Sequence, residues 1–230
     1  MFFTEKVLGG IDTIHIVFGV SALRSLLDIA GVDPLTLGEK KASSTPHATL
    51  EGIQAALTAT SKIHDVNVSS TAAVLAAFVP LLQLSSPAPA ITLLSSVAAF
   101  VPPPTRSLYG ASKAAQLQLF QAVAIESAAQ AEASPPAPST AHRQKVRFLA
   151  VAPATIRTAF RQSAIDGPVS AATKDSAWDD AAGSKGSSSS EILEPSQVAH
   201  AAIRATDRYE TGVRAMPGKY RLVRYAYPFV

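Results

Sequence analysis

Three side chains in the stretch from Ser96 to Lys113 could transfer a proton together. Tyr109 and Lys113 are four residues apart, so on an α-helix they share one face and can reach one pocket. A free phenol has a pKa near ~10, and a neighbouring ammonium favours the phenolate and lowers that pKa. Ser96, thirteen residues before the tyrosine, could place a hydroxyl beside the same reacting oxygen. Together the three residues supply a donor, an acid and a charge that tunes the acid.

The elements expected around these residues would bring them to one place. An apolar, β-branched run at 90–94 predicts a buried strand, and an Ala- and Gln-rich helix is expected to begin near Tyr109 and run to about Gln130. The Tyr-x-x-x-Lys spacing alone is a weak motif, because a surface tyrosine beside a surface lysine produces it too. The strand that ends in Ser95-Ser96, the proline-rich turn and the helix are the context that favours a site.

This pattern resembles the active-site signature of the short-chain dehydrogenase/reductase family, a serine followed about a dozen residues later by Tyr-x-x-x-Lys. The resemblance implies an α/β fold, a Rossmann-like doubly wound parallel sheet flanked by helices. It implies that Tyr109 is the general acid/base, that Lys113 lowers the tyrosine pKa and holds the cofactor ribose, and that Ser96 hydrogen-bonds the substrate oxygen. Asp-Val-Asn-Val at 65–68 is similar to the segment that carries a fourth member, an asparagine whose backbone holds a water next to the lysine. Asn67 would be that residue, although a helix cap or kink explains it as well.

The resemblance also implies contacts with NAD or NADP. The apolar strand expected at 11–18 ends at Gly19, where the family has Asn-Asn-Ala-Gly; only the glycine matches, and a plain turn explains it equally well. After a strand expected at 145–151, Pro153 and Thr158 match a Pro-Gly-x-x-x-Thr turn over the nicotinamide, with Ala154 in place of the glycine. The implied cofactor contacts are Gly19, Tyr109, Lys113, Pro153, Ile156 and Thr158.

The family's glycine-rich turn, Thr-Gly-x-x-x-Gly-x-Gly, has no match among the twelve glycines. In such a turn, backbone N–H groups and a helix N-terminus grip the pyrophosphate. We therefore expect residues 1–230 to form one partial, N-terminally truncated domain that lacks the first βαβ units. Two hypotheses follow: the strand at 11–18 is an apolar edge open to pairing with another chain, and nucleotides bind weakly.

Composition narrows the class of protein. Hydrophobic residues make up 47% of the chain, which suits a sheet covered on both faces. The absence of cysteine excludes disulfides and thiolate catalysis, and five scattered histidines make a metal site unexpected. A net charge of +3 from mostly scattered basic residues does not suggest nucleic-acid binding. Charged residues near the N-terminus argue against a signal peptide. The apolar stretch 68–84 is interrupted by polar residues and is shorter than the ~20 residues of a membrane span. A cytoplasmic location is therefore expected.

The remaining segments complete the expected fold. We expect a short helix at 22–29, helical structure over 49–84 with a break near 65–68, a helix starting at Pro195 and a strand at 213–220. Residues 131–144 and 166–190 are expected to be flexible insertions. The basic, aromatic C-terminal tail permits contact with a membrane surface, but single exposed residues on an ordinary protein surface are the better explanation.

The expected function is NAD(P)-dependent oxidoreduction of a small carbonyl or alcohol substrate, with hydride transfer to or from nicotinamide. The alternative is a truncated, cofactor-deficient pseudoenzyme that acts as a dimerisation or binding module. Small residues along the helix from Tyr109 suit a homodimer, and core packing explains the same pattern. A serine hydrolase is disfavoured because Gly-x-Ser-x-Gly is absent. The residues that select NAD or NADP follow the family's second strand, so this choice and the substrate stay open.

Overall fold

A parallel sheet forms the centre of the computed structural model, which describes residues 10–32, 46–103, 106–166 and 192–220. Within these residues the sheet has four strands in the order β1-β2-β3-β4. Their bounds are Thr13–Ile16, Ala90–Leu94, Arg147–Pro153 and Gly212–Met216. Neighbouring strands pair in parallel, with Ile14 opposite Ile91 and Ile91 opposite Phe148. A crossover connection therefore joins each strand to the next one in the sheet, as parallel pairing requires.

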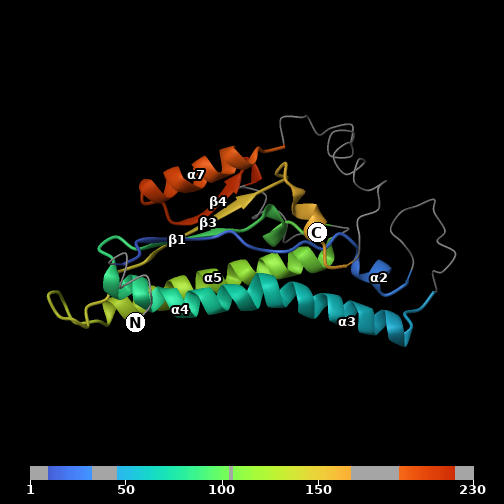
Figure 1. Cartoon of the computed structure of the whole chain (residues 1–230), viewed down its shortest axis with the longest axis horizontal. Helices are drawn as coiled ribbons and strands as arrows, with labels where there is room; N and C mark the ends of the chain where they lie inside the picture. The colour runs from blue at the N-terminus through green and yellow to red at the C-terminus, as the bar shows by residue number, and fades with distance from the viewer. Residues whose placement is uncertain (1–9, 33–45, 104–105, 167–191, 221–230) are drawn as a thin grey trace.

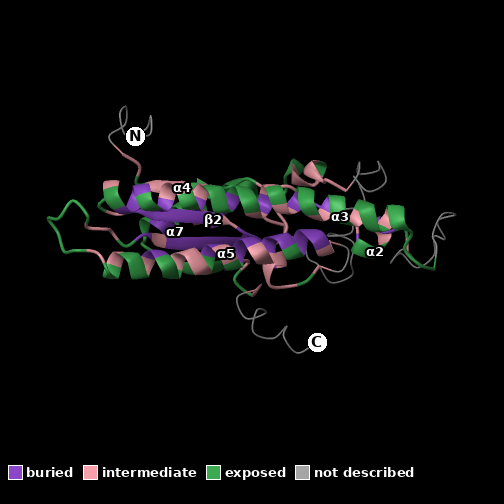
Figure 2. Ribbon diagram, turned by 90° about the horizontal axis from the view of Figure 1, so that it is seen from below, coloured by how far each residue is buried: buried purple, intermediate pink, exposed green. Residues whose placement is uncertain are grey.

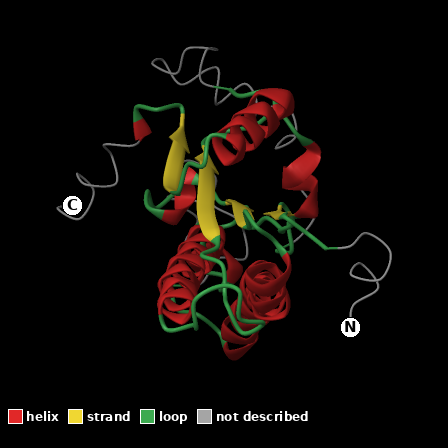
Figure 3. Ribbon diagram, turned by 90° about the vertical axis from the view of Figure 1, so that its left-hand side faces the viewer, coloured by secondary structure: helices red, strands yellow, loops and turns green. Residues whose placement is uncertain are grey.

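Helices cover both faces of the sheet (Figure 1). α4 (Ser70–Ser85) and α5 (Ser107–Glu132) lie side by side on one face, and α7 (Pro195–Asp207) lies on the other (Figure 3). α3 (Leu50–His64) continues into α4 through a π-helical turn, η1 (Asp65–Ser69), and extends beyond the sheet toward the short α2 (Leu26–Ile29). The architecture is the Rossmann-like α/β arrangement that the sequence predicted.

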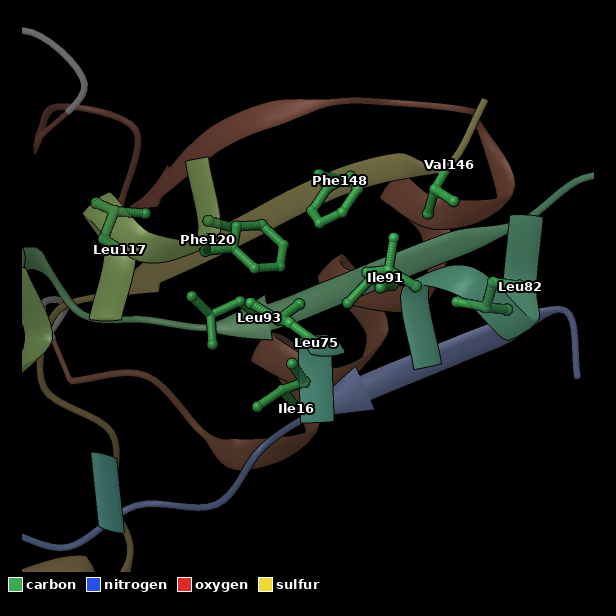
Figure 4. Close-up of a cluster of buried hydrophobic side chains, with 11 residues drawn as sticks. Ile16, Leu75, Leu82, Ile91, Leu93, Leu117, Phe120, Val146 and Phe148 are labelled. Atoms are coloured by element: carbon green, nitrogen blue, oxygen red, sulfur yellow. The ribbon is translucent and has the colours of Figure 1, made fainter. Parts of the chain in front are cut away.

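The main core lies between the sheet and the α4–α5 pair (Figure 4). Alternate residues of each strand face opposite sides, so Ile91 and Leu93 point toward α4 and α5 while Leu149 and Val151 pack against α7. The rings of Phe120 and Phe148 meet edge to face at 5.0 Å between centroids. β2 and β3 are buried along almost their whole length (Figure 2), which is why their sequences read as continuous apolar runs.

The predicted element types are found, and several boundaries move. The strand at 90–94 is confirmed, whereas the strand predicted at 11–18 is wrong in length, because only Thr13–Ile16 pairs with β2. The helix predicted at 22–29 is also shorter: the Ser25 side chain accepts a hydrogen bond from Asp28 N, so the helix begins at Leu26. The break near 65–68 is the π turn, and Pro195 begins α7.

The segment 131–144 begins inside a helix, since α5 continues to Glu132. The rest is irregular and is tied to the end of α4: Gln144 N donates to the Gln83 carbonyl at 2.8 Å, and Arg143 Nη1 donates to Gln83 Oε1 at 3.0 Å. The segment 166–190, apart from Asp166, lies outside the described residues, as does the tail 221–230.

The continuous helix from Leu50 to Ser85 has 36 residues, and a stretch within it has a mean hydropathy of 1.6, so by length and composition alone it could cross a membrane. Core helices of α/β proteins pass the same test. Here Leu75, Val79 and Leu82 pack into the core beneath β1 and β2, so we interpret its α4 half as the core helix predicted at 68–84.

Candidate active site

A cavity of about 600 Å³ opens where β1, β2 and β3 end. Parallel strands deliver the residues that follow them to one edge of the sheet, which is where doubly wound folds build their sites. Asn67 is the one predicted site residue that does not line this cavity. The others all do: Gly19, Ser96, Tyr109, Lys113, Pro153, Ile156 and Thr158.

Ser96 follows β2 and caps a short 3-10 helix, η2 (Val97–Ala99). Its Oγ accepts the backbone N–H of Ala98 at 3.1 Å, which leaves the serine O–H able to donate elsewhere. Hydrogen bonding with the Ser96 side chain lowers the pKa of the Tyr109 phenol, and both residues line the cavity. The neighbouring Ser95 Oγ is buried in the same wall and has no hydrogen-bond partner among the described residues. A bound molecule could satisfy this polar atom.

Tyr109 stands in the first turn of α5 and is only 6% exposed. Burial raises the pKa of its phenol, while the hydrogen bond with Ser96 and the charge of Arg106 lower it. The Arg106 guanidinium lies over the tyrosine ring, 4.2 Å from its centroid, and the Phe160 ring packs edge-on at 5.8 Å between centroids. The phenol is therefore a neutral proton donor at pH 7, held by aromatic and cationic contacts.

Lys113 lies one helical turn beyond Tyr109 and is 4% exposed. Its Nζ donates to the Leu94 carbonyl at 3.1 Å and to Gln116 Oε1 at 2.8 Å. Burial lowers the pKa of Lys113 to about 8, which leaves the ammonium mostly charged at pH 7. A Cβ on Gly19 would lie 3.6 Å from Nζ, an ordinary contact, but only 3.1 Å from Asn67 Oδ1, so the glycine lets the chain pass close to Asn67 beside the lysine. The ammonium thus sits where the cavity meets the helix α5.

Asn67 is fully buried in the π turn behind the cavity. Its Oδ1 accepts Val20 N at 2.8 Å, and its Nδ2 donates to the Val20 carbonyl at 3.1 Å and to Ser112 Oγ at 3.0 Å. Its own carbonyl accepts the Thr71 hydroxyl at 2.9 Å. The side chain therefore joins the loop after β1 to α5, a structural role that the resemblance did not imply.

A chain of buried polar side chains connects Lys113 to Asn67. Gln116, which accepts from Lys113, donates through Nε2 to Thr71 Oγ1 at 2.8 Å, and Thr71 in turn donates to Asn67. Each member is hydrogen-bonded, as buried polar groups must be. Gln116 was not singled out in the sequence, although it follows Lys113 by three residues and so shares its helical face.

The turn after β3 forms the opposite wall. Ala154, which replaces the family's glycine, is unstrained, because among the described non-glycine residues only Tyr209 has a positive φ. Ala154 N donates to the Met216 carbonyl at 2.7 Å, and Thr158 Oγ1 accepts Phe160 N at 3.3 Å. The turn is thus fixed to β4 and leads into the 3-10 helix η3 (Ala159–Ser163).

Two arginines in the cavity wall were not singled out in the sequence, Arg106 and Arg161. Arg106 precedes Tyr109 by three residues, so helical spacing could have indicated it. Arg161 reaches the cavity only because η3 folds back over α5, and local spacing gives no signal for that contact.

Comparison with known proteins agrees with this geometry. A model of the short chain dehydrogenase family matches residues 42–168, more than half of the chain. The chain therefore belongs to the short-chain dehydrogenase family, whose members are oxidoreductases. No curated protein matches the sequence.

Solved structures share the fold at low sequence identity. A short chain dehydrogenase from Burkholderia cenocepacia in complex with NADP has a TM-score of 0.57 at 16% identity, over 95% of this chain and 65% of the other. A short chain dehydrogenase/reductase from Burkholderia phymatum in complex with NAD gives 0.61 at 16%, over 96% and 66%. ElxO with NADP bound gives 0.58 at 21%, over 94% and 70%. This chain thus spans about two thirds of the length of these neighbours.

Proposed function

We propose that this chain is an NAD(P)-dependent oxidoreductase that interconverts a small carbonyl compound and its alcohol, with Tyr109 as the general acid/base. The observation that carries the proposal is that Ser96, Tyr109 and Lys113 line one cavity at the carboxyl edge of the sheet, where the Ser96 side chain lowers the pKa of the Tyr109 phenol. In carbonyl reduction Tyr109 gives its proton to the substrate oxygen, and Ser96 donates a hydrogen bond to the same oxygen.

The nicotinamide end of a cofactor has a place in this cavity. Gly19 leaves room beside Lys113, and the orphaned Ser95 Oγ offers a polar partner in the wall. Lys113 would hold the ribose hydroxyls, and Pro153, Ile156 and Thr158 would line the nicotinamide face. When bound, the cofactor supplies or takes up the hydride. Asn67 would hold the proton-relay water through its backbone, as the resemblance implies. A cytoplasmic location is part of the same proposal.

The test is a carbonyl-reduction assay with millimolar NADPH or NADH that follows the loss of the reduced nicotinamide. Tyr109→Phe removes the acid while keeping the ring between Arg106 and Phe160, so we expect kcat/KM to fall by about 10²- to 10⁴-fold. Tyr209→Phe is the matched control, because Tyr209 is 65% exposed and lies outside the cavity; its activity should equal that of the wild type. Equal activity of Tyr109→Phe and wild type would refute the assigned role.

The second candidate is a cofactor-deficient binding module, and one observation favours it: no glycine-rich pyrophosphate turn occurs in the sequence. Exposed apolar side chains that a second copy could contact occur on α3 and on α5: Leu50, Ile53 and Leu57 on the first and Ile125 on the second. A stable dimer in sedimentation, with no turnover of any carbonyl and no effect of Tyr109→Phe, would favour this candidate over the enzyme.

A further inference from the structure

The cavity carries an excess of positive charge. Of its lining residues, Arg106, Lys113 and Arg161 are cationic, and within the described part of the chain none is an aspartate or glutamate. The charge of Lys113 is partly solvated by the carbonyl and amide oxygens that accept its hydrogen bonds. Both arginines belong to the part of the wall around Tyr109: the Arg106 guanidinium lies over its ring, and Arg161 follows the Phe160 that packs against it.

Arg106 is held in place and keeps bonding capacity. Its Nη2 donates to Ser21 Oγ at 2.7 Å and its Nε to the Ala22 carbonyl at 3.2 Å. Its Nη1 makes no hydrogen bond among the described residues. The carboxylate that attracts it is Asp166, whose Oδ2 already accepts the backbone N–H groups of Leu23 at 2.8 Å and Arg24 at 2.6 Å. A fixed guanidinium with a free N–H edge is suited to a planar anion.

Arg161 is half-buried on η3, next to the Phe160 that packs on Tyr109. Its guanidinium makes neither a hydrogen bond nor an ion pair with the described residues, although its backbone carbonyl accepts Ala164 N at 3.3 Å. Burial lowers its pKa, and its charge lowers the pKa of Arg106, so the two guanidiniums repel each other in one cavity. A half-buried, unpaired charge is costly, and the attraction of an anion bound between the two arginines would offset both the desolvation of Arg161 and the repulsion between the guanidiniums.

We propose that the substrate carries a carboxylate, bound by Arg161 and the free edge of Arg106, while its carbonyl lies at Tyr109 and Ser96. This inference rests on the proposed function and names the substrate class of that site: an oxo acid or the matching hydroxy acid. Most of the other lining residues are apolar, with Val97, Val101 and Phe160 among them, so the carbon chain between the two polar ends is aliphatic or aromatic. The alternative anion is a phosphate of the cofactor, and the test separates the two.

The probe pair is 4-oxopentanoate and its methyl ester, which share a carbonyl and differ in charge. Binding to the whole chain is measured by calorimetry without cofactor, and reduction is measured with millimolar NADPH. We expect Arg161→Gln to weaken binding of the acid about tenfold to a hundredfold and to leave the ester unchanged. Arg161→Lys keeps the charge but loses the planar guanidinium, so its affinity for the acid should lie between those of the wild type and Arg161→Gln.

Arg204→Gln is the matched control, since Arg204 is an exposed arginine on α7, across the sheet from α5, and the same charge is removed. It should behave as wild type with both probes. Added salt should weaken binding of the acid and not of the ester. Thermal unfolding of Arg161→Gln near the wild-type midpoint shows that the variant is folded.

The outcomes are distinct. If the wild type reduces the acid and the ester equally and Arg161→Gln changes neither, the oxidoreductase proposal stands and the carboxylate is wrong. If Arg161→Gln weakens NADPH binding while the ratio of acid to ester holds, the arginine serves a cofactor phosphate and the inference is overturned. If the wild type reduces neither probe but binds the acid through Arg161, the anion site stands and the oxidoreductase proposal is weakened. If the wild type binds neither probe, the carboxylate site is refuted.

Discussion

The Lys113 ammonium is solvated inside the protein by one carbonyl and one amide oxygen. Burial lowers its pKa from 10.5 to about 8, a difference worth roughly 3 kcal/mol. The unfolded chain binds this proton more tightly than the folded chain. The lysine is therefore a stability penalty that is fully present below pH 8 and is relieved as the pH rises to about 10.5.

Replacing the lysine should remove this pH dependence. Between pH 7 and pH 10 we expect the free energy of unfolding of the wild type to rise relative to that of Lys113→Met by roughly 2 to 3 kcal/mol. Urea unfolding followed by circular dichroism at several pH values measures the difference. Lys62→Met, at an exposed position on α3, is the control and should run parallel to the wild type. Parallel curves for Lys113→Met would show that Lys113 titrates normally.

The site depends strongly on the continuous helix formed by α3, η1 and α4, because the π turn η1 places Asn67 in the interior. Three hydrogen bonds of this one side chain connect the continuous helix to two other elements, two to the loop after β1 and one to α5. A π turn adds one residue to a helical turn and often occurs at functional sites. Here the π turn contains the buried Asn67, whose amide holds the loop that carries Gly19 through both backbone groups of Val20.

Asn67→Ala should therefore lower the free energy of unfolding by more than the removal of so few atoms would suggest. The substitution leaves Val20 N, the Val20 carbonyl and Ser112 Oγ without these partners, and we expect a loss of about 2 to 4 kcal/mol in the free energy of unfolding. Ser70→Ala removes one exposed hydrogen bond, from Ser70 Oγ to the Asp65 carbonyl in the same turn, and should cost about 0.5 kcal/mol or less. Urea midpoints of the two variants decide the matter. Equal losses would mean that the inward amide is not what holds the loop.

At the scale of the whole molecule, the chain offers a binding cavity for one end of a dinucleotide and no recognisable phosphate-binding turn for the other. Gly19, Lys113 and the turn from Pro153 to Thr158 line one cavity, and under the proposed function the nicotinamide end would bind there. For the pyrophosphate end the sequence has no glycine-rich turn. Backbone N–H groups of such a turn and the helix that follows it are the usual phosphate ligands in this type of sheet.

We therefore expect NADPH to bind this chain no more than about tenfold more tightly than reduced nicotinamide mononucleotide, with both dissociation constants above the micromolar range. Calorimetry with both ligands, and with the adenosine half alone as a control, measures this. Micromolar binding of NADPH together with clear binding of the adenosine half would overturn the expectation and would point to a phosphate site elsewhere in the chain.

The sequence by itself determined what depends on local periodicity. Apolar runs predicted β2 and β3, helical spacing placed Tyr109 and Lys113 on one face of α5, and Pro195 marked the start of α7, because strand and helix repeats are short-range properties. The residues that follow the strands could be placed at a common edge for the same reason. The length of β1 could not, since pairing with β2 alone decides it.

Only the tertiary structure decided the electrostatics of the site. The cation over the Tyr109 ring is Arg106, the pKa of Lys113 falls through burial, and Arg161 enters the cavity through the fold of η3. Each of these depends on contacts between distant segments and on the water they exclude. Desolvation is a property of the packed chain, so no local pattern of residues could have shown it.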